Sequence, residues 1–150
     1  MPTLVGIGAS INESSKEAIE EALDQASKNL QGNIPSFLML LASPTVYDQQ
    51  ELVNFLKSRC PEATLIGCST SGEISSVSGS RDGSLALMAI YSDKVKFVAG
   101  VGKNIQKDPR EAGRELAQSV GKTGKNKPKA ALILPDGLAG NGADIVRGVL

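Results

Sequence analysis

Apolar runs alternate with amphipathic stretches through the first half of the chain, a pattern typical of an α/β sheet with helices on its faces. Strands are predicted over Thr3–Gly8, Phe37–Ala42 and Ala63–Cys68. Between them, apolar positions three and four residues apart predict helices that begin after Ser14 and Asp48. Short connections and right-handed crossovers make these three strands parallel.

The pattern changes after Cys68. The polar stretch Ser69–Gly83 has no helical period, and two further strands are predicted beyond it, Ser84–Tyr91 and Val95–Val101. The three residues between these two strands predict a hairpin turn. A strand that returns in this way makes the sheet mixed rather than wholly parallel.

The last third of the chain predicts a helix, a strand and a second helix. Asp108 with Pro109 is a strong helix start, Lys129–Leu134 is an apolar run typical of a buried strand, and Ala143–Leu150 begins a helix. The fold class is therefore α/β, with a mixed, largely parallel sheet and helices packed on its faces. The element order is β-α-β-α-β-β-β-α-β-α.

The length of 150 residues fits one domain, and we find no boundary within residues 1–150. The final predicted helix has only two turns of apolar face, from Ile145 to Leu150. An end this short buries that face poorly, so we expect the domain to be incomplete at its C-terminus.

Composition removes several classes of function. Sixteen basic and 16 acidic residues give a formal net charge of zero, so no global field gathers nucleic acid or an anionic membrane. A lysine-bearing loop over Gly121–Pro128 is typical of a solvated surface segment. No signal peptide and no apolar run near the about 18 residues of a membrane helix are present, so we expect a cytoplasmic protein.

The chain has no histidine, which excludes Ser-His-Asp and Cys-His catalysis and the commonest zinc ligand. Its two cysteines, Cys60 and Cys68, form no Cys-x-x-Cys motif. Gly6-x-Gly8 closes a strand as a dinucleotide fingerprint does, but Ile11 stands where the third glycine is required. We therefore predict no cofactor and no metal site.

Small polar residues collect where the predicted strands end. Ser10 and Ser43 follow the first two strands, Ser69 follows the third, and Asp136 follows the predicted strand Lys129–Leu134. Open α/β sheets bind ligands in the crevice outside the carboxyl ends of their strands. Hydroxyls and backbone N–H groups at this edge suit a small polar or zwitterionic molecule, although the same residues are common in ordinary turns.

The segment Ile66-Gly67-Cys68-Ser69-Thr70-Ser71-Gly72-Glu73-Ile74 resembles the hallmark of the FIST N-terminal domain, named for F-box and intracellular signal transduction. Further stretches resemble the same family in order along essentially the whole chain: Val5–Ser10, Ala18–Leu30, Phe37–Ala42, Asp48 with Leu52, Pro61 and Leu134–Leu138.

The resemblance implies an intracellular sensory domain that binds a small ligand such as an amino acid and reports it to a C-terminal FIST domain or a signalling output module. It implies a ligand loop at the hallmark positions, which are Gly67, Cys68, Ser69, Thr70, Ser71, Gly72 and Glu73. To these the strand-end pattern adds Ser10, Ser43 and Asp136. We expect a binding function rather than an enzyme.

Two alternatives stay open from the residues alone. One is a histidine-independent enzyme that uses Cys68 as a nucleophile or Glu73 with Asp136 as a carboxylate pair. The other is a scaffold that docks a partner protein through the apolar surface around Ile145 and Leu150.

Overall fold

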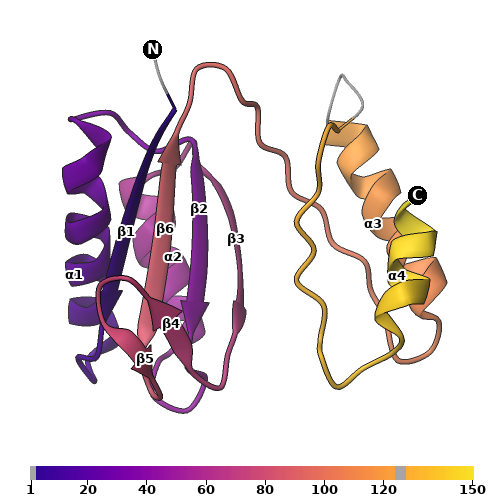
Figure 1. The fold of residues 1–150 in the computed structure, drawn as a ribbon, viewed down its shortest axis with the longest axis horizontal. Helices are drawn as coiled ribbons and strands as arrows, with labels where there is room; N and C mark the ends of the chain where they lie inside the picture. The colour runs from indigo at the N-terminus through magenta and orange to yellow at the C-terminus, as the bar shows by residue number, and fades with distance from the viewer. Residues whose placement is uncertain (1–2, 124–127) are drawn as a thin grey trace. The chain divides into compact units, whose positions relative to one another are not determined.

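A computed structural model describes residues 3–123 and 128–150 of the chain (Figure 1). Its elements in chain order are β1 (Leu4–Ser10), α1 (Ser15–Ser27), the 3-10 turn η1 (Lys28–Leu30), β2 (Phe37–Ala42), α2 (Gln49–Arg59), β3 (Thr64–Ser69), β4 (Glu73–Ser75), β5 (Gly79–Arg81), β6 (Leu85–Tyr91), α3 (Pro109–Thr123) and α4 (Gly142–Val149). They separate into two compact units, Met1–Phe97 and Val98–Leu150. The single domain predicted over residues 1–150 stays a prediction.

The first unit is built on a four-stranded sheet with the order β1-β6-β2-β3. The fold class α/β is confirmed, but the expectation of a largely parallel sheet is wrong. Strand β6 inserts between β1 and β2 and runs antiparallel to both, so β2 and β3 form the parallel pair in this sheet. Strands β1, β2 and β3 still point the same way, and their carboxyl ends share one edge.

The predicted strand Val95–Val101 does not form a ladder in the described structure. A hairpin partner needs a free edge on β6, and both edges of β6 are already paired, by β1 and by β2. The chain turns away instead at Ser92, whose hydroxyl accepts hydrogen bonds from the backbone amides of Lys94 and Val95. Phe97 then stacks its ring on Phe37, with centroids 4.7 Å apart.

A second, two-stranded sheet lies in the polar stretch for which the sequence predicts no element. Strands β4 and β5 form an antiparallel hairpin around Ser76, Val77 and Ser78. Gly79 follows the turn with a positive φ of 71°, a conformation that glycine adopts without strain. The Ser75 hydroxyl accepts from the Ser78 amide, so local hydrogen bonds hold the turn. The sequence of this hairpin has no alternation of apolar and polar residues from which its strands could be predicted.

Both helices of the first unit begin where the sequence predicts. The side chain of Ser14 accepts from the amide of Glu17 at the start of α1, and Asp48 accepts from two amides at the start of α2. In a full capping box Glu17 would accept from the Ser14 amide. Here Asn12 takes that role with its side-chain oxygen, and its side-chain amide donates to Glu17.

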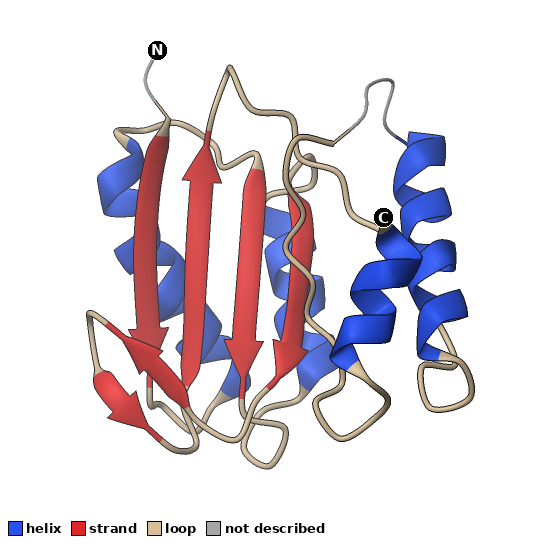
Figure 2. Cartoon of the chain, turned by 45° about the vertical axis from the view of Figure 1, so that its right-hand side comes forward, coloured by secondary structure: helices blue, strands red, loops and turns tan. Residues whose placement is uncertain are grey.

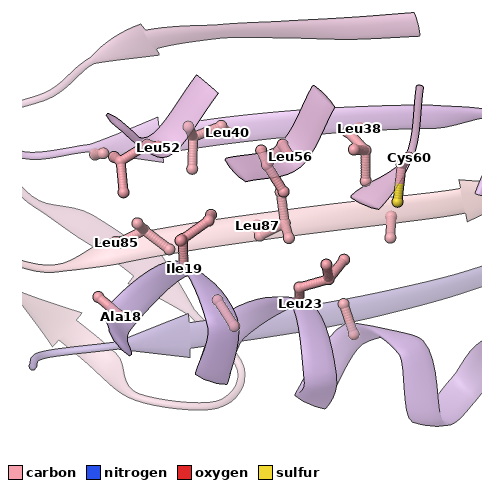
Figure 3. Close-up of a cluster of buried hydrophobic side chains, with 14 of the residues drawn as sticks. Ala18, Ile19, Leu23, Leu38, Leu40, Leu52, Leu56, Cys60, Leu85 and Leu87 are labelled. Atoms are coloured by element: carbon pink, nitrogen blue, oxygen red, sulfur yellow. The ribbon is translucent and has the colours of Figure 1, made fainter. Parts of the chain in front are cut away.

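Helices α1 and α2 cover one face of the four-stranded sheet (Figure 2). Figure 3 shows Ile19 and Leu23 of α1 facing the β6 residues Leu85 and Leu87, with α2 above β2. The core of the unit is this single layer, in which most side chains are fully buried: Ala18, Ile19, Ala22, Leu23, Ala26, Leu30, Leu38, Leu40, Ala42, Tyr47, Leu52, Leu56, Cys60, Leu85, Leu87 and Ala89.

Two glycines allow α1 to lie directly against β1. A side-chain carbon placed on Gly6 would fall 1.8 Å from the carbonyl oxygen of Ala26, and one placed on Gly8 would fall 1.8 Å from that of Ala22. Both are impossible contacts with helix backbone. The Gly6-x-Gly8 pattern therefore serves helix–strand packing.

The second unit pairs α3 with α4. Asp108 accepts from the Glu111 amide at 2.9 Å, as predicted for this helix start, and α3 continues through Thr123 into the predicted loop. Residues 124–127 of that loop lie outside the described residues. The helices meet at Gly113 and Gly148. A side-chain carbon on Gly113 would fall 2.3 Å from the Ile145 carbonyl oxygen, and one on Gly148 would fall 2.0 Å from that of Arg110.

The predicted strand Lys129–Leu134 is wrong for the described structure, which assigns these residues to no ladder. Apolar sequence alone does not make a strand, because the backbone must find a neighbouring strand to bond. The described part of Val98–Leu150 contains two helices and no strand with which these residues could pair. Ile145 of α4 is buried, and Leu150, which follows the helix, is exposed.

We predict that Gly8→Ala destabilises the first unit by about 1–3 kcal/mol, because the added methyl group must push α1 away from β1. Urea denaturation followed by circular dichroism measures the change. Gly121→Ala is the control: a side chain there meets nothing within 4 Å and replaces a helical glycine, so stability should hold or rise. Unchanged stability in Gly8→Ala would contradict the close packing.

Candidate functional site

The carboxyl ends of β1, β2 and β3 meet at one edge of the sheet, and β6 begins there because it runs the opposite way. Leu85 of β6 is in register with Ser10 of β1 and Ala42 of β2, and Ala42 is in register with Ser69 of β3. The predicted gathering of small polar residues is thus a feature of the structure within the first unit. We refer to this region as the carboxyl edge.

Glu73 is enclosed at the carboxyl edge, with 2% of its surface exposed. The Thr70 hydroxyl donates to one carboxylate oxygen and the Ser84 hydroxyl to the other. A carboxylate withdrawn from water needs such partners, since an unpaired buried charge is costly. The two hydrogen bonds join the loop after β3, the start of β4 and the residue before β6.

Tyr47 contributes a further hydroxyl group at the carboxyl edge. Its hydroxyl lies 3.4 Å from the carbonyl oxygen of Ser10 and 3.3 Å from that of Gly83, and its one hydrogen is shared between these two acceptors. Burial, followed by the negative charge of nearby carboxylates led by Glu73, raises the pKa of the Tyr47 phenol. The phenol thus donates between the last residue of β1 and the loop before β6.

Ser10 and Ser43 lie at the predicted edge, but their hydroxyls serve internal contacts. The Ser10 hydroxyl donates to Glu21 at 2.6 Å and accepts from the Asn12 amide at 3.1 Å. The Ser43 hydroxyl lies 3.0 Å from that of Thr45. Both serines are buried. They fix the loops that follow β1 and β2.

Most of the hallmark positions between Gly67 and Glu73 are exposed. Cys68, Ser69, Ser71 and Gly72 all face solvent. Gly67 has a packing reason: a side-chain carbon there would lie 2.2 Å from the Leu40 carbonyl oxygen of β2. The hallmark thus exposes a thiol and a hydroxyl at the end of β3 and a second hydroxyl in the loop that follows.

Asp136 belongs to the second unit, whereas the other predicted site residues belong to the first. Its carboxylate accepts from the Leu138 amide at 2.9 Å, as expected for a reverse turn. Within residues 3–123 and 128–150, no group of three or more Cys, Asp or Glu side chains is arranged to hold a metal ion.

Two residues of the edge escape prediction from the sequence. Tyr47 and Ser84 have no motif around them, and each gains its role from a partner more than ten residues away. The one available signal is that Ser84 immediately precedes an apolar run, as Ser10 and Ser43 closely follow theirs.

Comparison with family models gives one match, to the FIST N domain, over residues 36–150. This range covers more than half of the chain and contains the whole hallmark. The chain belongs to the FIST N domain family. The resemblance read from Ile66–Ile74 is therefore confirmed. No curated protein matches the chain.

Among solved structures, this FIST N domain is similar to an empty FtsZ dimer of M. jannaschii, with 21% identity and a TM-score of 0.39 over 59% of this chain and 26% of that one. It is similar to a mutant FtsZ of M. jannaschii at 19% identity and the same TM-score of 0.39, over 60% of this chain and 27% of that one. The chain thus matches about a quarter of each FtsZ chain. None of the helices in the described ranges is long and apolar enough to cross a membrane.

For the FIST N domain we predict that Glu73→Ala lowers the free energy of unfolding by about 1–3 kcal/mol. The substitution leaves the hydroxyls of Thr70 and Ser84 without the carboxylate that accepts their hydrogen bonds. Hydrogen exchange should increase over β4 and β5. Glu73→Gln should lose less, because an amide oxygen still accepts and a hydroxyl can reverse its direction. Ser76→Ala, in the exposed hairpin turn, is the control. Wild-type exchange in Glu73→Ala would argue against an anchoring role.

The two thiols should differ in reactivity. Burial raises the pKa of the Cys60 thiol, whereas Cys68 is exposed. Because the thiolate is the reacting form, we predict that a disulfide reagent near neutral pH modifies Cys68 rapidly and Cys60 slowly. Unfolding in urea should bring both rates together. Cys68→Ser should abolish the fast phase and Cys60→Ala should keep it; two fast thiols in the native protein would contradict the assignment.

Proposed function

We propose that this FIST N domain is the sensory part of a cytoplasmic signalling protein and binds a small polar ligand, such as an amino acid, at the carboxyl edge. The observation that carries the proposal is the contrast at the hallmark. Glu73 is fixed in the interior by Thr70 and Ser84, while Cys68, Ser69 and Ser71 expose polar side chains beside it. A binding loop needs both, a rigid base and accessible donors and acceptors.

Binding rather than catalysis fits the chemistry of the edge. A general base must reach a substrate proton within hydrogen-bonding distance. Both oxygens of Glu73 already accept hydroxyl hydrogens, and its surface is 2% exposed. Ser69 and Ser71, by contrast, can donate to and accept from a ligand without disturbing the core.

The position of the hallmark gives a route by which ligand binding is transmitted to a partner. The hallmark continues directly into the β4–β5 hairpin, and Ile74 on this hairpin is 87% exposed. A ligand that contacts Ser69 and Ser71 differently in two arrangements of the hairpin shifts the population between them. We propose that a C-terminal FIST domain or an output module reads that shift.

A thermal-shift screen of the protein against the standard L-amino acids and small hydroxy acids tests the proposal. A ligand that binds only the folded state stabilises it by about 2.7 kcal/mol at a hundred times its dissociation constant. We expect a saturable rise in melting temperature with one compound class. The variant Ser69→Ala with Ser71→Ala should weaken it at least about tenfold, the loss of roughly one hydrogen bond.

Ser58→Ala is the matched control, since this exposed serine lies at the other end of the sheet, in α2, and donates to Phe55. Unaltered affinity in the double variant would remove the hallmark hydroxyls from the site. A screen without any stabilising compound would leave the exposed loop without a ligand and favour the docking of a partner protein.

A further inference from the structure

A cavity of about 170 Å³ lies at the end of the first unit remote from the carboxyl edge. It is open to solvent on one side and lined by three segments: the last turns of α1, the residues that lead into β2, and the end of α2. Its lining comprises Leu23, Asp24, Ser27, Asn33, Ile34, Pro35, Arg59 and Cys60. A water molecule takes up about 30 Å³ in the liquid, so the space exceeds one water several-fold, and it is smaller than the about 300 Å³ at which drug-sized sites begin.

Two side chains of opposite charge lie at the rim of the cavity. Asp24 comes from α1 and Arg59 from α2, and both are exposed. The two form no ion pair with each other; the salt bridges within the described residues join other side chains, in α3 and α4. The Arg59 guanidinium lies 5.8 Å from the centre of the Phe55 ring, a cation–π contact that orients the guanidinium without using its hydrogen-bond donors.

Two helix ends add to this field. Helix α1 ends at Ser27 and α2 ends at Arg59, so both C-termini lie at the cavity. The carbonyl groups at a helix C-terminus carry partial negative charge and favour a cation. Together with Asp24, the end of α1 creates a position for an ammonium group, while Arg59 offers a fork of donors for a carboxylate.

Polar and apolar side chains share the wall between the charged groups: Ser27 and Asn33 are polar, and Leu23 and Ile34 are apolar. Leu23 and Cys60 are buried beneath the cavity, and Ile34 lines it with 69% of its surface exposed. The segment that carries Ile34 is held in place, because both the backbone amide and the side-chain amide of Asn33 donate to the Leu30 carbonyl oxygen. The wall is thus positioned before any ligand arrives.

We propose that this cavity is a second small-molecule site, which takes a small zwitterion with a short aliphatic body. The ammonium group lies at Asp24 and the end of α1, the carboxylate at Arg59, and the aliphatic part against Ile34 and Leu23. The site is independent of the carboxyl edge and goes beyond the function proposed for it.

L-valine is the probe, titrated into the ¹⁵N-labelled full chain to about ten millimolar, a range that detects even millimolar affinity. We expect saturable shifts of the backbone amides of Leu23, Ser27, Asn33 and Ile34. Asp24→Asn and Arg59→Gln should each weaken binding at least about tenfold, the effect of losing one charge-assisted hydrogen bond. The matched controls Glu20→Gln and Lys57→Gln, exposed on the same two helices, should bind as the wild type does.

Two analogues test the ligand class: 3-methylbutanoate lacks the ammonium group and 2-methylpropylamine lacks the carboxylate, and each should bind at least about tenfold more weakly. Equal binding by either analogue overturns the assignment to a zwitterion. No saturable shift at Leu23 to Ile34, or shifts unchanged in Asp24→Asn and Arg59→Gln, overturns the site.

The same spectra separate this site from the carboxyl edge. Shifts confined to Ser69–Glu73 overturn the second site and leave the proposed function standing. Shifts at Leu23 to Ile34 that persist in the variant Ser69→Ala with Ser71→Ala support the second site, whatever the outcome at the hallmark.

Discussion

Strand β6 pairs with two strands that the chain forms much earlier, and most of the first unit depends on that pairing. It joins β1 on one side and β2 on the other, with seven residues in register with β1. Its inward side chains, Leu85 and Leu87, complete the layer beneath α1 and α2. Because β6 is antiparallel, its first residues arrive at the edge where the other strands end. Ser84 thereby reaches Glu73.

The hallmark of the family divides by position into structural and accessible residues. Gly67 lets β3 approach β2, and Glu73 binds the strand ends together through hydroxyl groups. Cys68, Ser69 and Ser71 lie between them and are exposed. A short motif can thus combine the support of a loop with the chemistry that the loop presents. This division underlies our proposal that ligand contact belongs to the exposed positions.

Local features of the fold were predictable from the sequence. The helix starts at Ser14, Asp48 and Asp108 depend on side chains within three residues of the first turn, and all three are confirmed. The strand Phe37–Ala42 follows from its apolar run, with identical bounds in the structure. The rejection of a dinucleotide site at Gly6-x-Gly8 agrees with the packing of α1 on β1.

Non-local features were not predictable. The β-α-β pattern suggests that β1 and β2 are neighbours, and nothing in either strand says that β6 will separate them. The same fact decides the predicted hairpin at Val95–Val101, since β6 has no free edge. Likewise, the sequence marks Glu73 as a member of a polar loop, and only its contact with Ser84 explains its burial.

The separation of β1 from β2 also sets an order of events in time. No ladder joins these two strands directly, so a nascent chain that has emerged only as far as the β4–β5 hairpin holds β1 on one side and the β2–β3 pair on the other, with both edges open. The sheet is complete only when residues 85–91 pair with both β1 and β2. The pairing with β1 joins residues more than 70 positions apart in the sequence. Such distant pairing is slow to find, and until then the apolar strand edges are exposed to other chains. For this topology, the interval between synthesis of β3 and arrival of β6 is the period in which aggregation competes with folding.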